Sequence, residues 1–136
     1  MATFLWRYDG EPAPASLDTP FTDVPPGRFY SVAVAWLSEQ GITTGTTPTT
    51  FSPEDSVTRA QMATFLWRYS GSPEPASLDT PFIDVPAGRF YSKAVAWLVE
   101  QSITTGTSPT TFSPDDPVTR GQMATFLWRL AGEPAV

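Results

Sequence analysis

The sequence predicts a mainly α-helical fold built from tandem repeats. The heptapeptide Met-Ala-Thr-Phe-Leu-Trp-Arg begins at Met1, Met62 and Met123, so it recurs with a constant period of 61 residues, and self-similarity at a fixed period is typical of repeat architectures. Together with the residue that follows, its apolar side chains fall at i, i+3, i+4 and i+7, the spacing of one helix face. The stretches between copies are rich in glycine, proline and threonine, which interrupt helices.

Composition excludes several classes of function. The 136 residues contain no cysteine and no histidine, which removes thiol nucleophiles, imidazole bases and the commonest transition-metal ligands. The net charge is −6, and the arginines recur at equivalent points of the repeat instead of forming a basic stripe, which argues against nucleic-acid binding. No apolar run approaches the ~18 residues of a membrane span. We expect no cofactor, no metal and no enzymatic activity.

The N-terminal methionine aligns with methionines inside the later repeats. Met1 corresponds to Met62 and Met123, so the chain starts within a repeat, and the pattern of a signal peptide is absent from it. We expect it to come from a longer secreted protein, with an extracellular, cell-surface location and a signal peptide outside this chain.

The elements follow one another in the same order in each repeat. A helix over residues 1–8 leads into a proline-rich connector over 9–20, which we expect to be ordered against its neighbours. A second type of helix has its apolar face at Tyr30, Ala33, Val34 and Leu37. The predicted units are a half repeat with connector (1–20), a first repeat with connector (21–81) and a second repeat (82–136), together forming one compact domain.

Turn and cap signals set the ends of these helices. Gly41 supplies a left-handed stop after the second helix type, and Ser102 takes its place in the next copy. The Thr- and Pro-rich segment 42–53 predicts a hairpin or wide turn. Thr58 followed three residues later by Gln61 forms a capping box at the start of the heptapeptide helix.

Five segments in a fixed order resemble the S-layer homology repeat of bacterial surface proteins. They are Phe-x-Asp-Val, Tyr-x-x-Ala-Val-x-x-Leu, Gly-Ile-Thr-x-Gly, Phe-x-Pro and Val-Thr-Arg-x-Gln-x-Ala-x-Phe-Leu, and the resemblance covers residues 21–68 and 82–129. It implies three repeats packed as a pseudo-threefold helical bundle with long Pro- and Thr-rich loops. It also implies a module that anchors exported proteins by binding an anionic, often pyruvylated, secondary cell-wall polysaccharide in grooves between repeats.

The resemblance also suggests binding residues. In the family, the arginine of a Thr-Arg-Ala-Glu motif meets the sugar, and the residues that match this motif here are Thr58, Arg59, Gln61, Thr119, Arg120 and Gln122. Glutamine replaces the usual glutamate, which keeps hydrogen-bonding capacity and drops a charge. The chain has two full units and a half instead of three. The unpaired helix at residues 1–8 would therefore complete a threefold core within one chain or pair with another chain.

Each candidate residue also has a purely structural interpretation. Arg59 and Arg120 open a helix, where free backbone N–H groups favour an anion, but they could equally be solvated residues beside a cap. Trp36 and Trp97 lie off the apolar face of their helix, so they are candidates for sugar stacking or for core packing.

Other repeated residues are interpreted structurally. For Trp6, Trp67 and Trp128 we favour the core. Asp23 and Asp84 are expected to accept hydrogen bonds from nearby backbone. The acidic pairs at 54–55 and 115–116 could bind Ca²⁺, but their spacing is only weak evidence for a calcium site. We favour a role in which they compensate the dipole at a helix N-terminus.

The sequence thus predicts a non-enzymatic anchoring module that binds cell-wall polysaccharide. The alternative is a structural self-association module, in which neighbouring chains fill the surface left by the half repeat and form a homo-oligomer or a filament.

Overall fold

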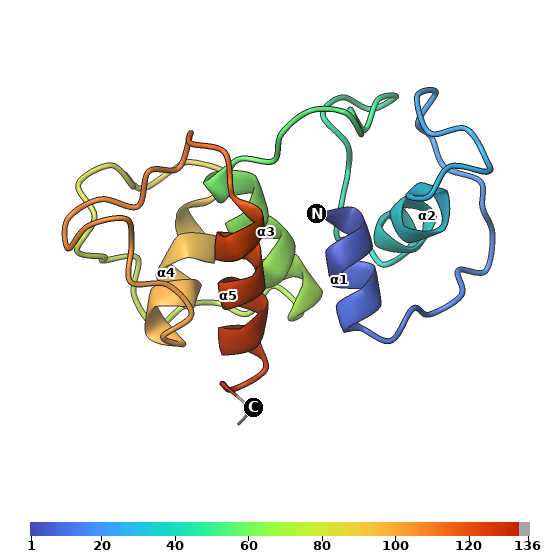
Figure 1. The fold of residues 1–136 in the computed structure, drawn as a ribbon. Coiled ribbons are helices and arrows are strands. Elements are labelled where there is room, and N and C mark those ends of the chain that lie inside the picture. The colour runs from blue at the N-terminus through green and yellow to red at the C-terminus, as the bar shows by residue number, and fades with distance from the viewer. Residues whose placement is uncertain (134–136) are drawn as a thin grey trace. The chain divides into compact units, whose positions relative to one another are not determined.

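The computed structural model describes residues 1–133. This part of the chain forms the α-helices α1 (Ala2–Tyr8), α2 (Ser31–Glu39), α3 (Arg59–Tyr69), α4 (Ser92–Glu100) and α5 (Arg120–Leu130), with long loops between them (Figure 1). Its β-structure is limited to isolated bridges within turns and between loops. The predicted mainly α fold of tandem repeats is therefore confirmed.

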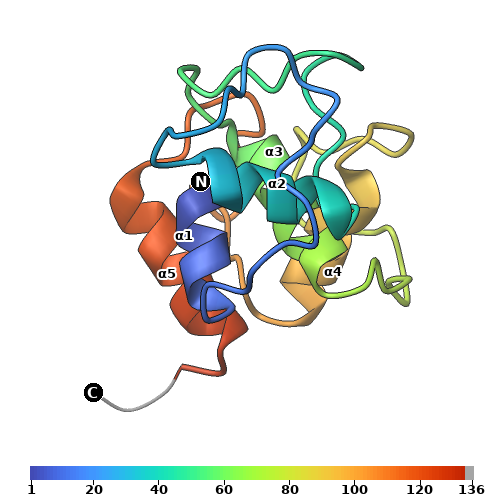
Figure 2. The same ribbon diagram turned by 90° about the vertical axis from the view of Figure 1, so that its right-hand side faces the viewer.

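The chain divides into two compact units, Met1–Asp55 and Ser56–Val136. In the first unit α1 packs against α2, and in the second α3 packs against α4, as the two ribbon views show for each pair (Figures 1 and 2). A heptapeptide helix thus packs against the helix that follows it along the chain. The pseudo-threefold bundle and the single compact domain with units 1–20, 21–81 and 82–136 stay predictions, and residues 134–136 lie outside the described part.

The connectors make this pairing possible because they fold back along the helices. In the first unit the indole Nε1 of Trp6 donates a hydrogen bond to the carbonyl of Pro12 at 2.8 Å, and the Ala15 N–H donates to Glu39 Oε2 at 2.7 Å. The second unit repeats both bonds, from Trp67 to the Pro73 carbonyl and from the Ala76 N–H to Glu100 Oε2. The expectation of an ordered connector is confirmed.

The tryptophans of the heptapeptide were predicted to lie in the core, and this prediction is wrong. Trp6 and Trp67 are half-buried, and Trp128 is 43% exposed. An indole can bury its ring only where its N–H finds an acceptor, and for Trp6 and Trp67 the acceptor is a carbonyl of the connector at the edge of the unit. The fully buried side chains are instead aliphatic or phenyl groups: Leu5, Val34, Leu37, Met62, Leu66, Val95, Leu98 and Phe112.

The second type of helix ends as the sequence predicts. Gly41 has φ +72°, and Ser102 takes the same left-handed conformation with φ +60°. The N–H of Ile42 then donates to the Leu37 carbonyl and that of Gly41 to the Ser38 carbonyl, which satisfies the last turn of α2. Serine adopts this conformation at a steric cost that glycine does not have.

Two aspartates hold the Thr- and Pro-rich loops. The oxygens of Asp23 accept hydrogen bonds from the Phe51 and Ser52 N–H groups at 2.9 and 2.8 Å, and Asp84 binds Phe112 and Ser113 in the same way. The prediction of backbone partners is confirmed, but the partners are not nearby, because they lie 28 and 29 residues further along the chain. Each aspartate therefore closes a long loop.

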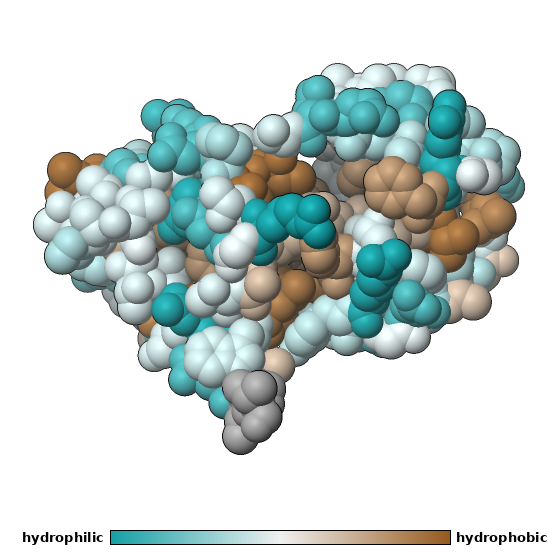
Figure 3. Space-filling model, viewed as in Figure 1, coloured by the Kyte–Doolittle hydropathy of each residue, from teal (hydrophilic) through white to brown (hydrophobic). Residues whose placement is uncertain are grey.

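On the face drawn in Figure 3, hydrophilic and neutral residues cover most of the surface, and apolar residues appear in separate patches. Within the described residues, no helix has the length and apolar character that crossing a bilayer requires.

Candidate functional site

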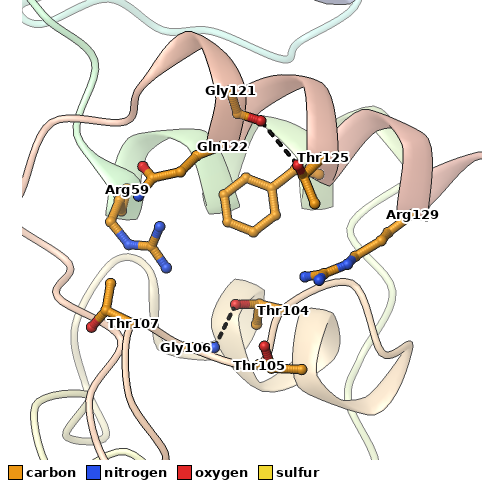
Figure 4. Close-up of a pocket in the computed structure, with 10 residues that line it drawn as sticks. Arg59, Thr104, Thr105, Gly106, Thr107, Gly121, Gln122, Thr125 and Arg129 are labelled. Carbon is orange, nitrogen blue, oxygen red and sulfur yellow. Dashed lines mark hydrogen bonds between the residues drawn. The ribbon is translucent and has the colours of Figure 1, made fainter.

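The second unit contains an open cavity of about 610 Å³ between the start of α3, the loop after α4 and one face of α5 (Figure 4). We call it the groove. It is lined by Arg59, Thr104, Thr105, Gly106, Thr107, Gly121, Gln122, Thr125, Phe126 and Arg129.

Arg59 stands at one end of the groove with its side chain held on several sides. The residue is 3% exposed, its Nε donates to the Phe112 carbonyl at 2.7 Å, and the guanidinium lies over the rings of Phe112 and Phe126, 4.7 and 5.5 Å from their centroids. Cation–π contacts of this kind are favourable when the cation is desolvated. The guanidinium is therefore fixed in place before any ligand arrives.

The terminal nitrogens of Arg59 are oriented toward the groove. No buried side-chain nitrogen of the described residues lacks a hydrogen-bond partner. The hydrogen bond from the Arg59 side chain to the Phe112 carbonyl uses Nε. Arg59 is only 3% exposed, and Figure 4 shows its guanidinium, with the two Nη groups, pointing into the space between α5 and the loop. Those groups can donate two parallel hydrogen bonds to a carboxylate.

Free backbone N–H groups were expected beside Arg59, and this expectation is wrong. The N–H groups of Arg59 and Ala60 donate to the carbonyls of Asp116 and Pro114 at 2.8 and 2.9 Å, and the Gln61 N–H donates to the Thr58 hydroxyl at 3.1 Å. The segment before α5 therefore satisfies the first turn of α3. Anion binding at this end depends on the arginine side chain and not on the helix terminus.

The loop after α4 forms the floor of the groove. The Thr104 hydroxyl accepts a hydrogen bond from the Gly106 N–H at 3.1 Å, and Gly106 has φ +86°. A Cβ at Gly106 would collide with the Phe82 ring and with the carbonyls of Thr111 and Ser108. Glycine is therefore required there, and it brings the threonines of the loop up to the cavity.

One face of α5 forms the opposite wall. Gln122, Thr125 and Arg129 lie along this face and point toward the cavity (Figure 4). The Thr125 hydroxyl donates to the Gly121 carbonyl at 3.0 Å, and Arg129 Nη1 donates to the Ile103 carbonyl at 3.2 Å. Arg129 is thus held against the loop at the far end of the groove from Arg59.

The groove is cationic although the chain is acidic. Two arginines and no acidic residue line it, whereas the whole chain has a net charge of −6. Burial lowers the pKa of Arg59, and the charges of Asp116 and Asp84 act in the opposite direction. The guanidinium group of an arginine remains a cation in proteins. The groove is therefore suited to an anion that also carries hydroxyl groups.

The groove contains two of the eight candidate residues, Arg59 and Gln122. Thr58 and Thr119 accept hydrogen bonds from the N–H groups of Gln61 and Gln122 in complete capping boxes, as predicted. Arg120 is exposed at the start of α5 and does not line the groove.

The tryptophans suggested for sugar stacking lie outside the groove as well. Trp36 is 5% exposed and Trp97 is half-buried, and neither lines the cavity. The buried indole of Trp36 offers no free face to a sugar, so the structure agrees with the core interpretation for this residue.

The acidic pair at 115–116 is not placed as expected. Asp115 and Asp116 precede α5, and no acidic residue stands in the first turn of α3 or α5, which is the region where a helix dipole acts. Asp116 instead provides its carbonyl to the Arg59 N–H. Within residues 1–133 no three acidic side chains gather closely enough to hold a metal ion.

Sequence reasoning missed most of the groove. It did not select Thr104, Thr105, Gly106 or Thr107, nor Thr125, Phe126 and Arg129 on α5. The available signal was the near-identity of the Thr-rich loops in the two repeats, since loops tolerate change unless they carry a function. The sequence analysis considered only the tryptophans of the heptapeptide, yet Arg129 at its end faces the cavity.

The model of the S-layer homology domain matches residues 20–63 and 81–124. The chain belongs to the S-layer homology family. The first match ends within α3 and the second within α5, so each includes a Thr-Arg-x-Gln cap.

Several bacterial proteins are similar in sequence to the chain. An endoglucanase of Bacillus sp. (strain KSM-635) is 40% identical over 110 residues, which cover 81% of this chain and 11% of that protein. A cell surface protein of Thermoanaerobacter kivui is 29% identical over 136 residues, 97% of this chain and 18% of that protein. The surface-layer 125 kDa protein of Lysinibacillus sphaericus is 34% identical over 109 residues, 77% of this chain and 9% of that protein.

Family membership gives the general role and location of the chain. It is an S-layer homology module for cell-surface anchoring, and it is extracellular and associated with the cell surface. The chain spans less than a fifth of the length of these relatives. The endoglucanase is matched over a small part of its length, so its catalytic activity is not transferred to this chain.

Proposed function

We propose that the groove of the second unit binds an acidic polysaccharide of the cell wall, and that this binding anchors the protein of which the chain is part. The observation that carries the proposal is the lining of the groove, which combines two arginines with threonine hydroxyls and has no acidic residue. Arginine pairs with carboxylates through two parallel hydrogen bonds, and hydroxyl groups can donate to and accept from sugar hydroxyls.

The acidic group of the sugar is assigned to Arg59. Its Nε and both ring contacts hold the guanidinium, so little side-chain entropy is lost when a carboxylate binds to the Nη groups. A pyruvate ketal on the sugar carries such a carboxylate, and we include pyruvylated polysaccharides among the ligands. Gln122, which lies near Arg59 in Figure 4, is assigned to a sugar hydroxyl.

Charge replacement at the two motif arginines tests the assignment. Arg59→Gln should weaken binding of purified secondary cell-wall polysaccharide by about 10- to 100-fold, since a hydrogen bond to a charged group contributes ~1.5–3 kcal/mol. Arg120→Gln removes the same charge from the same motif position but outside the groove, and it should bind like wild type.

Calorimetric titration with the polysaccharide, before and after chemical reduction of its carboxyl groups, measures both effects. Because Arg59 is buried, thermal unfolding of each variant must accompany the titration. Folded Arg59→Gln with unchanged affinity would contradict the proposal, as would wild-type binding that ignores carboxyl reduction.

Self-association of the chain stays a prediction as the alternative function. Light scattering of the purified chain with and without polysaccharide checks it, because a large particle indifferent to polysaccharide would favour assembly over anchoring.

A further inference from the structure

The groove contains a second arginine, Arg129, which comes from a different helix than Arg59. It belongs to the last turn of α5 and is half-buried against the loop after α4, where its Nη1 donates to the Ile103 carbonyl at 3.2 Å. The Nε of Arg59 donates to the Phe112 carbonyl at 2.7 Å. A guanidinium group has five N–H donors, and each of these bonds uses one. Each arginine is therefore held by a backbone carbonyl and keeps other donors for a ligand.

The two guanidinium groups point toward one another across the groove. Figure 4 shows both side chains extended into the same cavity, Arg59 from the start of α3 and Arg129 from α5. Among the described residues, no acidic side chain lines this cavity. Within residues 1–133, moreover, neither of the two arginines forms an ion pair. Two like charges that face one space repel each other, whereas an anion placed between them is attracted by both.

The equivalent arginine of the first unit has a different environment. Arg7 is exposed, and its Nε lies 3.7 Å from Oε1 of Glu11, four residues later in the chain. Arg129 also has a glutamate four residues later, Glu133, but its guanidinium is hydrogen-bonded to the Ile103 carbonyl instead. The loop after α4, and not the heptapeptide itself, therefore brings this arginine to the groove.

We infer that Arg59 and Arg129 bind the same acidic group of the glycan from opposite sides. The carboxylate lies in the space that both guanidinium groups face, and the sugar ring lies against the threonine hydroxyls of the loop after α4. A carboxylate has two oxygens, so each arginine can donate to a different one. Arg129 is then a specificity-determining residue, because it favours glycans with a carboxylate over neutral ones. This inference rests on the proposed function, and it adds a second arginine to the site of the carboxylate.

A double-mutant cycle on the two arginines tests the inference with purified secondary cell-wall polysaccharide. Arg129→Gln should weaken binding by about 10- to 100-fold, as expected for Arg59→Gln, because each substitution removes a charged donor from the same carboxylate. The double variant should lose much less than the product of the two single losses, since residues that act on one group are not additive. Calorimetric titration measures the three affinities against that of wild type.

Matched variants and a modified ligand serve as controls. Arg7→Gln removes the same charge from the equivalent position of α1 and should bind as wild type does. Arg129→Lys keeps the charge and a donor for the Ile103 carbonyl, so it should retain part of the affinity that Arg129→Gln loses. Polysaccharide with chemically reduced carboxyl groups should bind to Arg129→Gln and to wild type with the same affinity. Thermal unfolding shows which variants are folded, and Arg129→Lys takes the place of Arg129→Gln in the cycle if the latter is not.

The possible outcomes separate this inference from the proposed function. The inference is overturned if folded Arg129→Gln binds as wild type does, or if the two single losses multiply in the double variant, which would assign the arginines to separate groups. In either case a loss of binding by Arg59→Gln would leave the proposed function standing. Wild type that does not bind the polysaccharide, or that ignores carboxyl reduction, would overturn the proposed function and this inference with it.

Discussion

The starts of α3 and α5 have almost the same sequence and different surroundings. Both begin with Thr-Arg-x-Gln and both form a complete capping box. Arg59 is nevertheless buried between two phenyl rings and forms one end of the groove, whereas Arg120 is exposed and does not line it. The motif by itself therefore produces a helix cap. A binding site requires, in addition, the loop and the helix that pack around the arginine.

The groove around Arg59 depends on the turn at Gly106, and changing this turn should have the largest effect. Gly106→Ala would force a Cβ against two carbonyls and the Phe82 ring at φ +86°, and we expect a loss of about 3 kcal/mol in the free energy of unfolding. The loop that faces Arg59 would be displaced, so binding of the polysaccharide should fall as well. Chemical denaturation and calorimetry measure the two losses.

The matched control is the other glycine of the groove. A Cβ at Gly121 would meet only the Thr119 hydroxyl, at 3.9 Å, and α3 has Ala60 at the equivalent position. Gly121→Ala should therefore stabilise the chain by about 0.5–1 kcal/mol, as expected for alanine within a helix. A Gly106→Ala variant as stable as Gly121→Ala would show that the loop does not hold the groove in shape.

The aspartate clamps allow a second, smaller perturbation of the same site. The carboxylate of Asp84 accepts a hydrogen bond from the Phe112 N–H. The carbonyl of the same phenylalanine accepts the hydrogen bond from Arg59 Nε. Asp84→Asn places an N–H group opposite a backbone donor and should cost about 1–3 kcal/mol. It should also weaken polysaccharide binding, because the partner of Arg59 becomes less fixed. Asp23→Asn makes the same change in the first unit and should reduce stability while leaving the groove intact.

The Asp23 clamp should also respond to pH. Its hydrogen bonds, first of all that from Phe51, lower the pKa of Asp23 in the folded chain. The folded state then binds fewer protons than the unfolded state, so the clamp contributes fully above the unfolded pKa of about 3.9 and its contribution is lost as the pH falls through the folded value. The difference in unfolding free energy between wild type and Asp23→Asn should shrink below pH 4. A difference that is constant from pH 7 to pH 3 would contradict the assigned clamp.

The parts of the fold that depend on neighbouring residues could be predicted from the sequence. The capping boxes at Thr58 and Thr119 and the left-handed stops at Gly41 and Ser102 involve residues within one or two turns, and the structure confirms them. The apolar spacing of the heptapeptide likewise indicated a helix. Local chemistry determines these features, so both full repeats show them.

The groove could not be predicted in the same way, because its parts are distant in the sequence. Arg59 becomes a groove residue through Phe112, Phe126 and the threonine loop, all of which belong to the next repeat. The sequence analysis gave Arg129 no role, and the position of its side chain depends on its hydrogen bond to the Ile103 carbonyl. The Thr-Arg-x-Gln motif is the same in both copies, so it did not indicate which arginine would line a groove.

The two caps provide the most stringent comparison, since here we expect the smallest effect and no difference between the copies. Thr58→Ala and Thr119→Ala each remove a hydroxyl that accepts the N–H of the glutamine three residues later, at 3.1 and 3.0 Å. Each should lower the free energy of unfolding by about 1 kcal/mol, as measured by chemical denaturation. A much larger loss at Thr58 would mean that its cap is coupled to the buried Arg59. Equal losses would show that the two motifs are the same as helix caps, and that the packing around Arg59 accounts for the difference between them.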